Sequence, residues 1–64
     1  MNRNIIFFIE IERIKQVVDL SSVNASDRIA IDLKDGTRYY SRELSFGTDA
    51  IYGAFEYDDN YPAL

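Results

Sequence analysis

Residues 4 to 12 alternate between two sides of an extended backbone. One side is wholly apolar and carries Ile5, Phe7, Ile9 and Ile11. The other side begins apolar and ends acidic, with Ile6, Phe8, Glu10 and Glu12. A period of two residues predicts a β-strand. Because the first half of this strand is apolar on both sides, we expect it to lie inside a sheet or beneath a second layer.

The next hydrophobic stretch, residues 12 to 20, fits either of two periods. Ile14 and Val18 have the spacing of a short helical stripe, whereas the pair Val17-Val18 suits a strand that follows a turn. Because adjacent valines are poor helix formers, we favour the strand. Residues 21 to 27 are rich in Ser, Asn and Asp, which bond locally to the backbone, and this composition predicts a polar loop.

An Asp35-Gly36 pair separates two alternating runs, residues 28–34 and residues 37–42. Asp-Gly between such runs is a strong hairpin signal, because a type I′ turn needs positive φ at both central residues. The sequence therefore predicts an antiparallel hairpin here.

Two registers of this hairpin place its tyrosines differently. A two-residue loop pairs Lys34 with Thr37. It turns Tyr40 toward the apolar face and leaves Tyr39 outside. A three-residue loop with a bulge turns Tyr40 out, and it sets Lys34 opposite Arg38, a like-charge pair that is mildly unfavourable. We favour the first register.

Residues 48 to 57 again fit a helix or a strand. A helix capped by Thr48 would carry Gly53 at its centre, which costs about 1 kcal/mol relative to alanine. As a strand, the segment has one face of Ile51, Gly53, Phe55 and Tyr57. We favour the strand, since aromatic residues are common in strands. Residues 58–64 are expected to form an irregular tail, because the residue before Pro62 avoids helical backbone.

Together these elements predict a mainly β fold. We expect one small domain over residues 1–64, an antiparallel sheet of four to five strands, with one short helix only if residues 12–20 or 48–57 adopt it. The chain is 47% apolar and 28% charged, which is too hydrophobic and too evenly charged for a disordered chain. A chain of 64 residues buries only about 60% of its unfolded surface, so self-association or a partner would support its stability.

The net charge of −4 arises in the last twenty residues. Residues 1–44 carry seven acids and seven bases, and residues 45–64 carry four acids and no base. Acids steer a basic partner and tyrosines anchor it. We therefore expect a partner-binding surface made of Asp49, Tyr52, Glu56, Tyr57, Asp58, Asp59 and Tyr61. The alternative is that these tyrosines belong to the core or its edge, with the acids as a solvated rim.

Catalysis is not expected, because the chain has no histidine and no cysteine. It lacks the commonest general base and the most easily activated nucleophile. The acidic run at residues 58–60 does not have the spacing of a calcium loop, and the three glycines are scattered rather than grouped around a phosphate. We expect no catalytic residue, no metal and no cofactor. Direct binding of nucleic acid is also disfavoured by the negative net charge.

Two functions remain. The first is a small acidic protein-binding module, an inhibitor or modulator that occludes the basic, nucleic-acid-binding surface of a partner protein. In size, acidity and lack of catalytic groups the chain is similar to phage-encoded inhibitors such as anti-CRISPR proteins and DNA mimics, although no motif carries the likeness. The alternative is a β-domain that self-associates as a homodimer through an exposed strand edge, or a subunit of a larger assembly, with no inhibitory role.

A cytoplasmic location is expected. The apolar run over residues 5–9 is shorter than the apolar region of a signal peptide, and a membrane span needs about 20 apolar residues. The lack of cysteine agrees with a reducing compartment. We expect no membrane partner.

Overall fold

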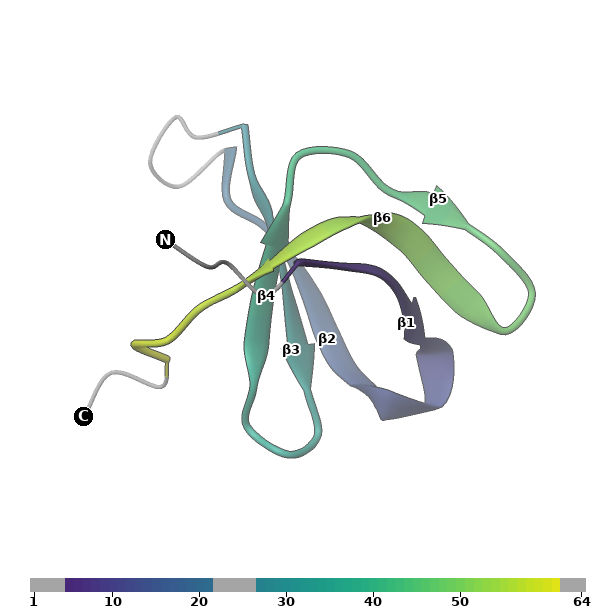
Figure 1. Ribbon diagram of the computed structural model, residues 1–64, viewed down its shortest axis with the longest axis horizontal. Helices are drawn as coiled ribbons and strands as arrows, with labels where there is room; N and C mark the ends of the chain where they lie inside the picture. Colours follow the sequence, from purple (N-terminus) through teal and green to yellow (C-terminus); the bar gives the residue numbers. More distant parts are fainter. Residues whose placement is uncertain (1–4, 22–26, 62–64) are drawn as a thin grey trace.

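The computed structural model describes residues 5–21 and 27–61 (Figure 1). Within these residues, one sheet holds six strands: β1 (Ile5–Glu10), β2 (Ile14–Asp19), β3 (Ile29–Leu33), β4 (Arg38–Ser41), β5 (Ser45–Phe46) and β6 (Ala50–Tyr57). Every pairing is antiparallel, in the order β1-β6-β4-β3-β2, with β5 beside β6. The prediction of a mainly β fold is confirmed, and the two-residue strand β5 adds to the expected number.

Both segments that fit two periods are strands. Residues 14–19 form β2 and residues 50–57 form β6, while a short 3-10 turn, η1 (Ile11–Arg13), joins β1 to β2. Of the predicted polar loop and tail, residues 22–26 and 62–64 lie outside the described residues. Among the described residues, no helix is long and apolar enough to cross a membrane.

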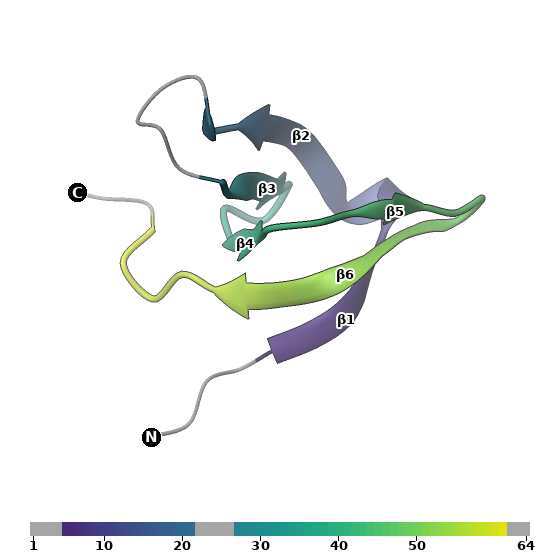
Figure 2. The ribbon, with the colours of Figure 1, turned by 90° about the horizontal axis from the view of Figure 1, so that it is seen from above.

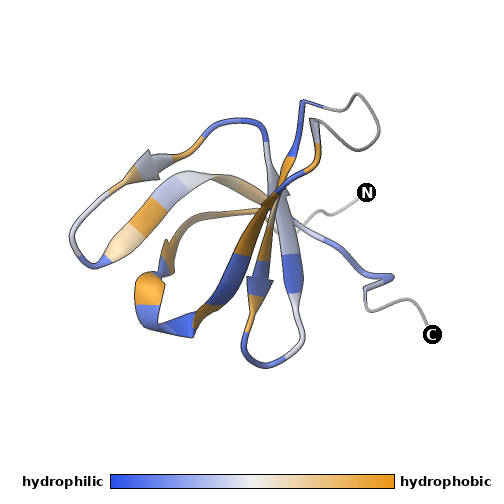
Figure 3. Cartoon of the chain, turned by 180° about the vertical axis from the view of Figure 1, so that it is seen from behind, coloured by the Kyte–Doolittle hydropathy of each residue, from blue (hydrophilic) through white to orange (hydrophobic). Residues whose placement is uncertain are grey.

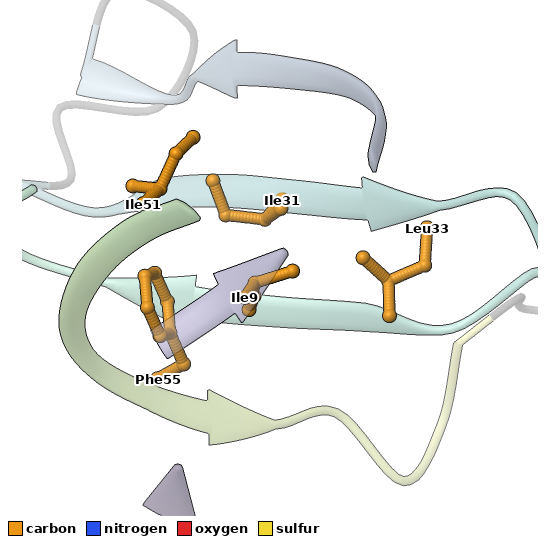
Figure 4. Packing of buried hydrophobic residues seen from close by; sticks show 5 residues of the cluster. All are labelled: Ile9, Ile31, Leu33, Ile51 and Phe55. Atoms are coloured by element: carbon orange, nitrogen blue, oxygen red, sulfur yellow. The ribbon is translucent and has the colours of Figure 1, made fainter. Parts of the chain in front are cut away.

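The core lies where the sheet folds over itself. Strand β6 pairs with β1 along one edge and with β5 and β4 along the other, so it links the two halves of the sheet. Figure 2 shows β1 and β6 running beneath the other strands. Figure 4 shows β6 curving around a cluster of buried side chains: Ile9, Ile31, Leu33, Ile51 and Phe55.

A β-bulge lets β6 bend. Between two paired positions, β6 advances three residues, from Tyr52 to Phe55, where β1 advances two, from Ile6 to Phe8. An extra residue in one strand of a pair bends that strand and increases its twist. The bend brings both ends of β6 against the same core.

The predicted burial of β1 is wrong. Strict alternation places Ile6 and Ile9 on opposite sides, yet Ile9 is buried in the core and Ile6 packs against it. Phe7 and Phe8 are both exposed. The strand lies at the edge of the sheet rather than inside it.

The hairpin is confirmed, but the favoured two-residue loop is wrong. The alternative, a three-residue loop that turns Tyr39 rather than Tyr40 toward the core, is present, but Asp32 and not Lys34 stands opposite Arg38. The Gly36 N–H donates to the Leu33 carbonyl over 3.1 Å, and the Leu33 N–H donates to the Thr37 carbonyl over 2.8 Å. The loop is therefore residues 34–36, with Gly36 at φ 95°. A three-residue loop that ends in a left-handed glycine is a common hairpin connection. Because Lys34 lies inside this loop, it does not face Arg38.

This register exchanges the roles of the two adjacent tyrosines. Tyr39 stands opposite Ile31 and packs against the core, whereas Tyr40 stands opposite Ala30. Tyr39 is thus the inward tyrosine, contrary to the favoured register. Tyr40 is instead placed to contact the segment that follows β6, where its hydroxyl reaches Asp58.

Candidate functional site

A groove of about 810 Å³ is lined by residues of β6 and its neighbours. Tyr52 and Glu56 line it, and they alternate with the buried residues Ile51 and Phe55. Its charged lining residues are Asp27, Arg28, Arg42, Glu43 and Glu56. Carboxylates therefore outnumber guanidinium groups by one in this groove.

An exposed aromatic pair adjoins the groove. Phe8 and Tyr52 stand opposite each other in the ladder between β1 and β6, with ring centroids 6.3 Å apart. Phe8 is 54% exposed and Tyr52 is 51% exposed. Neighbouring aromatic side chains at a protein surface are typical anchors of protein interfaces. Pairing in the sheet holds both backbones in place before any partner arrives.

Tyr40, another lining residue, is held by the C-terminal turn. Its hydroxyl donates to Asp58 Oδ2 over 2.6 Å. Burial raises the pKa of Tyr40, and the carboxylate of Asp58 raises this pKa further by favouring the protonated phenol. The guanidinium of Arg28 lies 4.4 Å from the Tyr40 ring centroid, a cation–π contact.

Both carboxylate oxygens of Asp58 accept hydrogen bonds within the protein. Besides the Tyr40 hydroxyl on Oδ2, its Oδ1 accepts the Asn60 N–H over 2.9 Å. Its own N–H donates to the Arg38 carbonyl over 3.0 Å. Asp58 therefore docks the turn that follows β6 onto β4.

Two of the predicted anchor tyrosines also pack within the protein. Tyr57 lies against Tyr39, with ring centroids 5.6 Å apart. The Tyr61 ring centroid lies 4.2 Å from Arg38 Cζ. These contacts fit the alternative in which tyrosines belong to the edge of the core, although Tyr57 remains partly exposed.

The predicted surface is therefore divided along β6. Asp49 lies immediately before β6 and Tyr52 lies in its first half. The remaining predicted residues belong to its end and the following turn: Glu56, Tyr57, Asp58, Asp59 and Tyr61. At about 3.3 Å per residue, the path along this bent strand from residue 50 to residue 57 is about 23 Å long. Tyr52 and Glu56 come together as groove residues, and Asp49 and Asp59 are exposed at opposite ends.

Sequence reasoning missed Phe8, Arg28 and Arg42 as site residues. Phe8 is expected in the interior of the sheet on its sequence pattern, and the two arginines lie far from the acidic tail in sequence. The one signal in the sequence that could have indicated Phe8 is the apolar run of β1. This run is apolar on both sides, so it carries more hydrophobic surface than one thin sheet can bury.

Among residues 5–21 and 27–61, no group of three acidic, histidine or cysteine side chains is placed to hold a metal ion. No protein-family model, curated protein or solved structure matches the chain. Function is therefore inferred from the groove and its surroundings.

Proposed function

We propose that the chain is a small, non-enzymatic protein-binding module. Its groove along β6 binds a segment of a partner protein that carries basic side chains. The observation that carries this proposal is the exposed pair of Phe8 and Tyr52 beside a groove with a surplus of carboxylates. An apolar side chain of the partner would rest on the two rings, while its bases meet Glu43 and Glu56.

The net charge of −4 supports a basic partner, since charge complementarity speeds the encounter of two proteins. In the finer form of the proposal, the occupied surface is one that otherwise binds nucleic acid, so the module acts as an inhibitor. A cytoplasmic site of action fits a chain without cysteine.

The first experiment locates the interface. A photo-crosslinking amino acid replaces Tyr52 in one variant and Lys34, in the loop between β3 and β4, in a control variant. Lys34 is exposed and is not a groove residue. Exposure to host extract should yield a crosslinked protein with the first variant only. The same products from both positions would contradict a groove interface.

The second experiment measures affinity for the captured protein at two salt concentrations. Asp49→Asn with Asp59→Asn removes exposed tail charges without touching a contact of the fold, whereas Asp58 is left intact because it holds Tyr40. Added salt and this double variant should each slow association, since exposed charges are screened within about 10 Å at 0.1 M salt. Tyr52→Ala should mainly speed dissociation. An affinity that changes neither with salt concentration nor with the Tyr52→Ala substitution would refute the proposal.

Inhibition is tested separately with the captured protein. The wild-type module should displace a labelled DNA or RNA duplex from that protein, and Tyr52→Ala should displace it less well. Binding of the module together with the duplex would leave a protein-binding module that does not inhibit nucleic-acid binding.

A further inference from the structure

We propose that the free edge of β1 pairs in antiparallel fashion with β1 of a second copy, which makes a two-fold symmetric dimer. Within the described part of the chain, β1 pairs with β6 alone, so its other edge presents unpaired backbone N–H and carbonyl groups. Such an edge is a template for another strand. The backbone groups of this edge are distinct from the proposed binding site, to which β1 contributes Ile5 in the groove and Phe8 beside it.

The sequence of β1 does not protect this edge. Natural edge strands avoid pairing through charges, prolines or short length. The opposite edge strand, β2, carries Lys15 and Asp19, and β5 has only two residues. In β1, five consecutive apolar residues precede Glu10, and Figure 3 shows hydrophobic colouring along this strand. Phe7 is 68% exposed there.

Charge favours the antiparallel arrangement and a second copy of the same strand. A two-fold axis sets two identical strands in opposite directions. Glu10, the one charged residue of β1, then lies at opposite ends of the pair instead of facing its own copy. A parallel pair in register would face the two Glu10 carboxylates, which is destabilising.

The exposed area indicates a weak dimer. If a phenylalanine side chain presents about 200 Å², the exposed fraction of Phe7 offers roughly 140 Å² per copy. A stable interface buries about 800 Å² per partner. We therefore expect the dimer to be populated near about 100 µM and dissociated near about 1 µM.

The salt dependence of self-association distinguishes this dimer from binding to a basic partner. Each copy carries a net charge of −4, so two copies repel each other at low ionic strength. Screening weakens that repulsion, and added salt should strengthen the dimer. Binding to a basic partner has the opposite dependence.

The test is sedimentation equilibrium over concentration, with Phe7→Lys and a matched control, Phe46→Lys. Phe46 is 73% exposed and lies on β5, which pairs with the other edge of β6. The wild type and Phe46→Lys should rise from 7.4 kDa toward twice that mass. Phe7→Lys should raise the dissociation constant about tenfold or more, which corresponds to 1.4 kcal/mol. Circular dichroism checks that each variant folds.

A second measurement does not depend on destabilising the dimer. Because the chain has no cysteine, Phe7→Cys and Phe46→Cys each provide a single thiol. Under mild oxidation, Phe7→Cys should form a disulfide-linked dimer faster than Phe46→Cys. Four outcomes would overturn the inference: a wild type that stays monomeric at every concentration, growth beyond two copies, equal loss of the dimer in both lysine variants, or equal crosslinking rates.

Discussion

Arg38 on β4 holds both carboxylate oxygens of Asp32, the residue opposite it on β3: Nε lies 2.5 Å from Oδ1, and Nη2 lies 2.9 Å from Oδ2. Gln16 on β2 donates to Oδ2 over 2.6 Å, and Tyr61 stacks on the guanidinium. Asp32 is only 3% exposed. Three strands and the C-terminal turn therefore meet at one buried carboxylate.

Removal of this arginine should destabilise the fold strongly. Arg38→Ala leaves the Asp32 charge buried with Gln16 as its remaining side-chain donor, and it also removes the support of Tyr61. Breaking a buried ion pair by deleting one partner costs about 3 to 5 kcal/mol. Urea unfolding at pH 7 measures the loss. The control is the exposed Arg42→Ala, which should change the free energy of unfolding by less than about 0.5 kcal/mol. Equal effects of the two variants would contradict the role of the pair.

Acid should weaken the protein through the same carboxylate. The Arg38 guanidinium holds the pKa of Asp32 below its usual value, and the Gln16 hydrogen bond adds to this effect. A carboxyl with a lowered folded pKa stabilises the fold above its unfolded pKa, about 3.9, and this stabilisation is lost as pH falls through the folded pKa. Asp32→Asn should therefore flatten the fall in the free energy of unfolding between about pH 5 and pH 2.

Some acid dependence should remain in that variant. The carboxylates of Asp19 and Asp35 accept hydrogen bonds from Ser21 and Thr37, and these bonds lower the pKa of each acid. The profile is measured by urea unfolding at a series of pH values. A profile that is unchanged by Asp32→Asn would show that the pair does not govern acid stability.

The link between Tyr40 and Asp58 predicts an effect at high pH. Burial and the Asp58 carboxylate raise the pKa of Tyr40, so its stabilising contribution is complete below the unfolded pKa, about 10, and is lost as pH rises through the folded pKa. Tyr40→Phe should lower the free energy of unfolding by about 1 kcal/mol at pH 7. The difference from the wild type should shrink above about pH 10. Tyr52→Phe, at an exposed tyrosine, is the control.

The local pattern of the sequence was sufficient for the strands and the hairpin, because alternation and an Asp-Gly turn act over a few residues. The same pattern was insufficient for the register of the β3–β4 hairpin. The pairing of Asp32 with Arg38 across the two strands favours a three-residue loop, whereas the Asp-Gly pair alone favours a two-residue turn. The edge position of β1 could not be predicted from its own residues, because it depends on pairing with β6, some 45 residues later.

The candidate site was predictable only in part, for a similar reason. Tyr52 stands out as a large aromatic residue on the polar side of a strand. The intramolecular partners of Asp58 and Tyr61 are Tyr40 and Arg38, about twenty residues earlier in the chain. Nothing in the tail itself indicates that its acid and its tyrosine are already engaged.

The hairpin turn should be sensitive to its glycine. Gly36 has φ 95°, where a β-branched side chain is strained even though a Cβ atom at this position would meet no other atom within 4 Å. Gly36→Val should lower the free energy of unfolding by more than about 1 kcal/mol. Thermal melts measure this, with Lys34→Val in the same loop as control. An unchanged midpoint for Gly36→Val would contradict the left-handed conformation.

Gly53 should be sensitive for a different reason, namely lack of space. A Cβ atom there would stand 2.7 Å from the backbone carbonyl oxygen of Glu43 and 3.1 Å from Ser41 Oγ. Gly53→Ala should therefore push residues 41–43 away from β6 and lower the free energy of unfolding by about 1 to 3 kcal/mol. Ala54→Ser, at the exposed neighbouring position, should have little effect. Because Glu43 and Gly53 both line the groove, Gly53→Ala should also weaken partner binding at temperatures where the variant is still folded. A variant as stable as the wild type, with an unchanged affinity, would show that this close approach of β6 to residue 43 is not required for the site.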